Sequence, residues 1–172
     1  ALGDAAVVVC AVGASESELE WSAPRRVDGE GTIRLVDAAA AAGVRQFILV
    51  SSLGTGKLGF PAGVLNLFGG VLIYKRRAEE ALERSGLSYL IVRPGGMEKP
   101  TDEYKATHNA RLAPRDTLFG GNVSRLQVAE LVAAAVAAPE AAENKCVELV
   151  AETKAPARGY EELLAGARSE AA

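Results

Sequence analysis

Three short runs of mostly apolar residues constrain the fold of this chain more than any other feature of its sequence. They span residues 5–12, 46–50 and 88–92, and each is rich in valine, isoleucine or leucine. Runs of this length, with apolar residues on consecutive rather than alternate positions, are typical of strands buried on both faces of a parallel sheet. The sequence therefore predicts a parallel sheet at the centre of the molecule.

Segments with helical periodicity alternate with these strands. The predicted helices cover residues 27–42, 71–85, 125–138 and 159–167. Gly43 and Gly86 are expected to end the first two helices, and Ser124 is a good N-cap for the third. A fourth buried strand is predicted at residues 145–151. Strands that alternate with helices at this spacing predict an α/β fold with a doubly wound parallel sheet.

The segments between these elements are polar or rich in glycine. Irregular structure is expected over residues 15–26, 51–70 and 97–116. Residues 1–168 are assigned to a single domain and residues 169–172 to a tail. The chain after Ala151 is weakly patterned and is expected to fray.

The predicted sheet is small for its class. A doubly wound nucleotide-binding domain carries about six strands or more, whereas the sequence predicts only four or five. The chain also opens on a strand, residues 5–12, that needs neighbours if both of its faces are buried. We therefore expect this chain to be the C-terminal part of a domain whose first strands and glycine-rich loop precede it.

Composition excludes several classes of function. The net charge is −3, so there is no electrostatic case for binding nucleic acid or an anionic membrane. Cys10 and Cys146 both lie in apolar runs and are expected to be buried, reduced thiols. The single histidine, His108, argues against a zinc site. No apolar run approaches the roughly 20 residues that span a bilayer.

Residues 54–59 have the pattern Gly-x-Gly-x-x-Gly directly after a predicted strand, which is typical of dinucleotide-binding turns. In such turns a helix begins at the glycines, so that its first amides face the pyrophosphate. Here Phe60 and Pro61 follow, and the next predicted helix begins only at residue 71. We therefore favour a flexible loop at the mouth of a site over a dinucleotide fingerprint.

Three features at the predicted strand ends could contact a ligand, because open α/β sheets bind ligands there. Ser51 and Ser52 close the second strand and could donate to a substrate carbonyl. Lys75 lies near the start of the next helix and could reach a cofactor ribose. Residues 93–96, Arg-Pro-Gly-Gly, close the third strand, where glycines let backbone approach a flat ring. The structural alternatives are a strand cap, a solvated ion pair with Glu79, and a plain turn.

Several stretches together resemble one protein family. They are residues 47–82, 85–104 and 116–131, with a strand ending in Ser-Ser, a helix with Lys-x-x-x-Glu, and a strand ending in Ile-Val-Arg-Pro-Gly-Gly. In these features the chain resembles atypical short-chain dehydrogenases of the NAD(P)-binding, NmrA-like type. More narrowly, residues 9–16 and 96–109 are similar to NADP(H)-binding subunits of the translocon that imports proteins across the chloroplast inner envelope.

The resemblance implies a Rossmann-like fold that binds NADP(H) and acts as a dehydrogenase or redox sensor. It implies a chloroplast location, in the stroma and peripheral to the inner envelope or thylakoid, with partners in a membrane-associated complex for protein import and redox regulation. In that subfamily a Pro/Ser-rich tail binds ferredoxin–NADP reductase. This sequence contains no such repeat, so we expect no such contact from it.

The family's Tyr-x-x-x-Lys pattern places its lysine on Lys75 and its serine on Ser52, which the resemblance therefore implies as catalytic residues. The tyrosine position falls on Val71, which has no proton to give. Tyr74, next to Lys75, is expected to point elsewhere. Proton transfer would then rely on Ser52, on solvent, or on an acceptor that needs no acid from the protein.

The expected cofactor contacts lie at the strand ends and on the helix that carries the lysine. They are Cys10, Ala11, Val12, Gly13, Ala14, Val50, Ser51, Ser52, Lys75, Pro94, Gly95, Gly96 and Met97. No metal site is expected. Two alternatives to an enzyme stay open: a non-catalytic scaffold that responds to NADP(H), and a structural subunit of a larger plastid complex.

Overall fold

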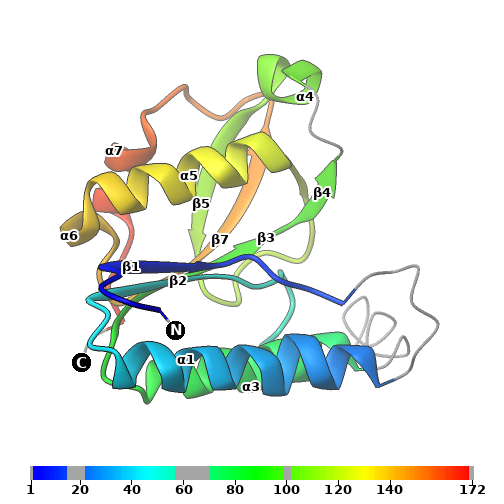
Figure 1. Cartoon of the computed structure of the whole chain (residues 1–172). Helices are drawn as coiled ribbons and strands as arrows, with labels where there is room; N and C mark the ends of the chain where they lie inside the picture. The colour runs from blue at the N-terminus through cyan, green and yellow to red at the C-terminus, as the bar shows by residue number, and fades with distance from the viewer. Residues whose placement is uncertain (1, 15–21, 57–69, 99–101, 171–172) are drawn as a thin grey trace.

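The computed structural model describes residues 2–14, 22–56, 70–98 and 102–170. Its main sheet has five strands in the order β1-β2-β3-β7-β5 (Figure 1). The strands are β1 (Val7–Cys10), β2 (Gln46–Val50), β3 (Ser88–Pro94), β7 (Lys145–Glu152) and β5 (Asn109–Pro114). The first four run parallel, and β5 pairs antiparallel with β7 at one edge. The predicted parallel sheet is therefore confirmed, with one antiparallel strand added.

The strand register brings the carboxyl ends of β1, β2 and β3 to one side of the sheet. Cys10 pairs with Leu49, Leu49 with Ile91, and Ile91 with Cys146. The segments that leave these ends are residues 11–14, 51–56 and 95–98, and we call them together the rim. The rim is where ligands bind in open α/β sheets.

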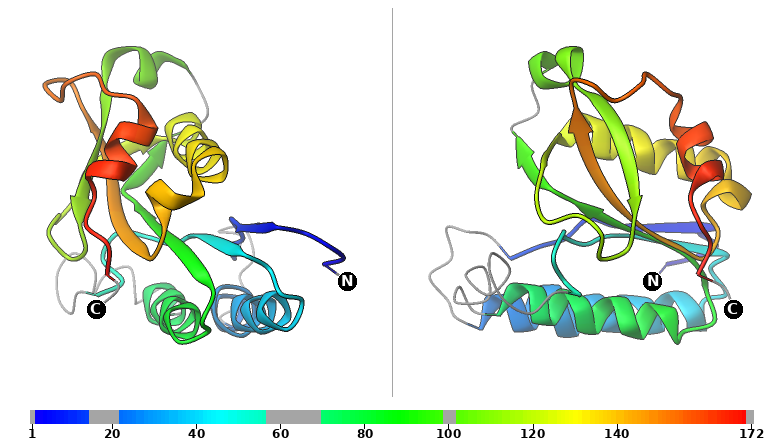
Figure 2. Two further views of the ribbon diagram at one scale, coloured as in Figure 1. Left: turned by 90° about the vertical axis from the view of Figure 1, so that its left-hand side faces the viewer. Right: turned by 180° about the vertical axis from the view of Figure 1, so that it is seen from behind.

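Helices cover both faces of the sheet, so the molecule has three layers (Figures 1 and 2). One face carries η1 (Arg25–Gly31), α1 (Thr32–Ala41) and α3 (Val71–Glu83); the other carries α5 (Arg125–Ala137), α6 (Pro139–Ala142) and α7 (Tyr160–Gly166). Val36 and Leu82 pack with Phe47 in the first hydrophobic core, and Leu131 packs with Leu90 in the second.

Local signals in the sequence set the ends of these helices. Gly43 and Gly86 have positive φ values of 71° and 78°, as expected for glycines that end a helix. The Ser124 hydroxyl accepts a hydrogen bond from the Leu126 amide at 3.1 Å. The side-chain oxygen of Gln127 accepts one from the Ser124 amide, also at 3.1 Å. This capping box confirms the predicted N-cap of α5.

The expectation of irregular structure over residues 97–116 is wrong. The segment contains most of β4 (Gly96–Glu98), all of α4 (Asp102–Thr107), and β5. Strand β4 pairs in parallel with β6 (Asn122–Ser124) in a second, two-stranded sheet. Strand β5 lacks an apolar run because it lies at an edge and is only half buried. Its pairing depends on β7, far along the chain, rather than on its own composition.

Two further expectations need correction. In β1, Val8 and Cys10 are buried, but Val9 is 46% exposed, so this edge strand is not covered on both faces by the described residues. Residues 152–170 are structured rather than frayed: they include α7, and the Glu170 carboxylate lies 2.5 Å from the Arg115 guanidinium.

Candidate functional site

Lys75 lies against the backbone that follows β1, and a buried carboxylate joins the two. The Lys75 Nζ atom lies 2.8 Å from Asp28 Oδ1. The other oxygen of Asp28 accepts from the Ala14 amide at 3.1 Å. A Cβ atom placed on Gly13 would lie 3.9 Å from the Lys75 Nζ atom. Predicted site residues that are far apart in the sequence therefore meet at one corner of the rim.

Asp28 was not among the predicted site residues. Its side chain is fully buried and lies in η1, a π-helical turn that replaces the start of the helix predicted over residues 27–42. π-Helical turns are rare and occur frequently at functional sites. The signal in the sequence was an acidic residue in the first turn of a helix that packs on a buried sheet.

The second and third strand ends are also adjacent. The Ser51 amide donates to the Val92 carbonyl at 2.7 Å, and the Leu53 amide donates to the Pro94 carbonyl at 2.9 Å. Ser52 therefore lies beside the end of β3. Its hydroxyl donates to the Leu53 carbonyl at 3.2 Å, and the residue is partly exposed at the rim.

The hydroxyl of Ser51 faces a buried ion pair beneath the rim. It donates to Glu79 at 2.5 Å, and Thr55 donates to the same carboxylate at 3.0 Å. Arg93 binds Glu79 through two nitrogens, at 3.0 and 2.7 Å, with both side chains fully buried. Burial opposes the charged form of Arg93, but the hydrogen bonds and charge of Glu79 outweigh it and raise the arginine pKa. The Ser51 hydroxyl is thus already bound within the protein.

The same network fixes a loop that crosses the rim, residues 115–121, which we call the crossing loop. Arg93 Nη1 donates to the Asp116 carboxylate at 2.8 Å. The buried Glu148 carboxylate accepts from the amides of Asp116, Thr117 and Leu118, at 2.9, 3.1 and 2.7 Å. The role of Glu148 was not predicted either, although a glutamate in the middle of an apolar strand is itself a sign of a buried, partnered charge.

The crossing loop ends against the glycines that close β3. The Gly96 amide donates to the Gly121 carbonyl at 2.9 Å. A Cβ atom on Gly95 would collide with that carbonyl, so this close approach requires glycine. The Arg-Pro-Gly-Gly segment is therefore the place where two chain segments meet at the rim.

Part of the Gly-x-Gly-x-x-Gly motif can be placed. Gly54 has φ of 91°, and Gly56 packs so closely on Asp116 that a Cβ atom would collide with its carboxylate. Lys57 and Gly59 lie outside the described residues. The described half of the motif is a turn that packs against the crossing loop.

Tyr74 and the two cysteines face protein rather than the rim. A Cβ atom on Gly29 would lie 3.1 Å from the Tyr74 ring, and the Arg77 guanidinium lies 5.4 Å from the centre of that ring. Both thiols are buried and free. Burial raises the pKa of Cys146 to about 12, which leaves it unreactive at neutral pH.

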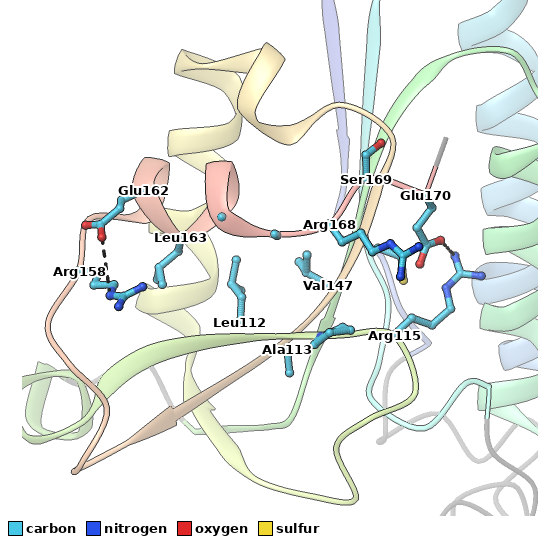
Figure 3. A pocket seen from close by; sticks show the side chains of 14 residues that line it. Leu112, Ala113, Arg115, Val147, Arg158, Glu162, Leu163, Arg168, Ser169 and Glu170 are labelled. Carbon is cyan, nitrogen blue, oxygen red and sulfur yellow. Dashed lines mark ion pairs between the residues drawn. The ribbon is translucent and has the colours of Figure 1, made fainter. Parts of the chain in front are cut away.

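A groove of the described structure, drawn in Figure 3, lies away from the rim. It has a volume of about 640 Å³ and lies between strands β5 and β7 on one side and α7 with the tail on the other. Leu112, Val147 and Leu163 line it, together with Arg158 and Arg168. None of the predicted cofactor-binding residues borders it.

Two classes of feature are absent from the described residues. No cluster of histidine, cysteine, aspartate and glutamate among them could bind a metal ion. None of the helices they form is long and apolar enough to cross a bilayer.

Comparison with known proteins gives a family and close relatives. A family model described as NAD(P)H-binding matches residues 1–139. The chloroplastic protein TIC 62 of Arabidopsis thaliana is 60% identical over 165 residues, which is 95% of this chain and 26% of that protein. TIC 62 of Pisum sativum is 59% identical, over 95% of this chain and 31% of that protein. The chain thus spans about a quarter to a third of the length of these curated relatives.

A solved structure supports the fold assignment. A putative NAD-dependent epimerase/dehydratase from Bacillus halodurans has a TM-score of 0.74 at 26% identity, over 94% of this chain and 68% of that chain. The expected fold class, a Rossmann-like α/β sheet, is therefore confirmed.

Proposed function

Because this chain belongs to the NAD(P)H-binding family, we propose that it is a redox module that binds NADP(H) across the rim. The observation that carries the proposal is the contact of Lys75 with Asp28, and of Asp28 with the Ala14 amide. It sets a cation beside the backbone after β1, at the strand ends where nucleotides bind in this class of fold.

The residues at this corner suit a nucleotide. A lysine ammonium has three N–H donors, and in Lys75 one points to Asp28 while the side chain stays 17% exposed. It can therefore donate to a ribose hydroxyl or a phosphate oxygen. The backbone of Cys10–Ala14 would border the cofactor on this side. Ser52 and the Pro94–Met97 segment would meet its nicotinamide end.

The bound cofactor supplies a hydride, and the chain supplies orientation. Lys75 would orient the ribose through its ammonium group, and Ser52, partly exposed at the rim, would donate a hydrogen bond to the acceptor. Val71 occupies the position of the family's acid and gives no proton. The acceptor is therefore one that takes its proton from water or needs none.

A second candidate function is a non-catalytic sensor that changes its affinity for a partner when NADP(H) binds. The valine at position 71 favours the sensor, because binding of NADP(H) requires no proton donor from the protein, whereas many reductions by NADPH do. The relatives named TIC 62 are chloroplastic. We propose a chloroplast location for this chain as well, and membership of a plastid protein complex that takes part in protein import. Redox regulation would act through binding of the cofactor.

The test compares NADPH binding and NADPH oxidation, with the quinone menadione as an artificial acceptor that can take a hydride, in the wild type and in Lys75→Ala and Ser52→Ala. We expect Lys75→Ala to weaken NADPH binding about tenfold, because one charge-assisted hydrogen bond is lost. Ser52→Ala should bind NADPH normally and oxidise it more slowly. The exposed Lys154→Ala serves as a control and should match the wild type.

The outcomes separate the two functions. Tight NADPH binding with negligible oxidation by the wild type would favour the sensor and reject the enzyme. Equal NADPH affinity in the wild type and Lys75→Ala would show that the cofactor does not lie at this corner.

A further inference from the structure

The groove of Figure 3 has apolar side chains between its two ends. Leu112 of β5 and Val147 of β7 line one side, and Leu163 of α7 lines the other (Figure 3). The volume of about 640 Å³ lies within the roughly 300–1,000 Å³ of pockets that hold small ligands. These walls favour a ligand with an apolar body, because a polar body would lose hydrogen bonds to water there.

Three arginines and two glutamates also line the groove, and only one of the five has no charged partner. Arg158 lies 3.6 Å from the Glu162 carboxylate. Arg115 lies 2.5 Å from the Glu170 carboxylate. Arg168 is exposed, and its side chain has no ion pair or hydrogen bond with any residue that the structure describes. The lining of the groove therefore carries an excess of one positive charge, and Arg168 provides it.

Arg115 lies at the same end of the groove as Arg168 (Figure 3). Its Nη2 group pairs with both Glu83 and Glu170, of which only Glu170 lines the groove. Its Nε–H is buried and finds no acceptor among the described residues. Two arginines and one glutamate thus line this end, which favours a ligand with an anionic group there.

The size of the excess charge distinguishes between anions. A carboxylate carries one negative charge, which balances the positive charge of Arg168, and it accepts two parallel hydrogen bonds from a guanidinium. A phosphate group carries about 1.5 to 2 negative charges at neutral pH and would also face the carboxylate of Glu170. Charge complementarity therefore favours a carboxylate.

We propose that this groove binds a single-chain carboxylate, a free fatty acid, with its acyl chain against Leu112, Val147 and Leu163 and its carboxylate on Arg168. An acyl chain suits these walls better than a peptide, whose amides would need hydrogen-bond partners that the three side chains do not offer. The site is separate from the rim, so this inference does not depend on NADP(H) binding.

The test measures the affinity of the chain for dodecanoate by isothermal titration calorimetry, below the concentration at which dodecanoate forms micelles. We expect Arg168→Gln to weaken binding about tenfold, because the charge-assisted hydrogen bond to the carboxylate is lost. Arg168→Lys should restore part of the affinity, because lysine keeps the charge but not the planar pair of donors. Dodecyltrimethylammonium, which has the same chain length and the opposite charge, should bind at least about tenfold more weakly than dodecanoate.

Methyl NMR spectra locate the ligand. Dodecanoate should shift the methyl signals of Leu112, Val147 and Leu163. The signals of Val136, which is 42% exposed on α5 and lies outside the groove, should not move. Arg45→Gln is the matched control for Arg168→Gln, because Arg45 is also an exposed arginine and lies outside the groove. It should bind dodecanoate as the wild type does.

Three outcomes would overturn the inference. They are equal dodecanoate affinity in the wild type and Arg168→Gln, equal methyl shifts at Val136 and Leu163, and equal affinity for dodecyltrimethylammonium. A chain that binds no dodecanoate but forms a dimer that Arg168→Gln dissociates would assign the groove to a second copy instead. NADP+ affinity should be the same in the wild type and Arg168→Gln, so none of these outcomes decides the proposed function.

Discussion

Charged side chains buried beneath the rim determine how its residues are placed. Arg93 and Glu79 are fully buried and bind each other through two hydrogen bonds. Removing one partner of such a pair costs about 3–5 kcal/mol, because the other charge is then left without compensation. Asp28 pairs with Lys75 in a similar way, one turn before Glu79 on α3. Single carboxylates thus fix the positions of the cations near the site.

The thiol of Cys146 gives a prediction for the pH dependence of stability. Burial raises its pKa to about 12, from a usual value of 9.0. The folded state thus favours the protonated thiol. This contribution to stability is fully present below pH 9 and is lost as the pH rises toward 12. The thiol should lower the free energy of unfolding by about 1.4 kcal/mol per pH unit in this window.

Urea unfolding of the wild type and Cys146→Ala between pH 7 and pH 11 measures this effect. The other titrating groups are common to both proteins, so the difference between the two stabilities isolates the thiol. We expect the advantage of the wild type to shrink above pH 9. A difference that stays constant to pH 11 would contradict the assignment.

Elements with a strong local signal could be predicted from the sequence. The apolar runs gave β1, β2, β3 and β7, and the capping residue Ser124 marked the start of α5. The strand β5 could not be predicted, because its residues suit an edge strand only when β7 lies beside it. At the site, Lys75 and Ser52 were identified through a resemblance. The contacts of Asp28 and Glu148 depend on tertiary packing, which no local pattern reveals.

The link between β7 and the crossing loop can be tested with Glu148→Gln. Glutamine keeps the shape of the glutamate side chain but removes its charge. Its NH2 group is a hydrogen-bond donor and would face backbone amides that are donors as well. We expect a loss of about 3 kcal/mol in the free energy of unfolding and a Tm lower by about 5–10 °C. Glu152→Gln, on the same strand but exposed, should change stability by less than about 0.5 kcal/mol.

At the scale of the whole molecule, the rim and the groove of Figure 3 lie in different places on the sheet. The rim lies at the carboxyl ends of β1, β2 and β3, whereas the groove of Figure 3 lies between the start of β7 and the tail. The buried ion pairs lie between α3 and the sheet and reach the crossing loop. Ligand binding at the rim is therefore expected to stabilise several elements together.

This expectation gives a prediction for thermal unfolding. NADP+ at 100 times its Kd should stabilise the wild type by about 2.7 kcal/mol, a rise in Tm of about 5–10 °C. Asp28→Asn should show a smaller rise at the same concentration, because Lys75 loses the carboxylate that positions it. Asp37→Asn, an exposed aspartate on α1, should respond as the wild type does. An equal rise in Asp28→Asn would show that this ion pair has no part in binding NADP+.

Glu148 binds the crossing loop through main-chain amides, and every residue type except proline has such an amide. These three contacts therefore do not depend on which side chains the loop carries at Thr117 and Leu118. Substitutions at Leu118 and Phe119 can alter the surface of the loop and leave the amide contacts to Glu148 intact. Related chains that keep this glutamate could thus diversify in what they recognise at the rim and preserve the same backbone.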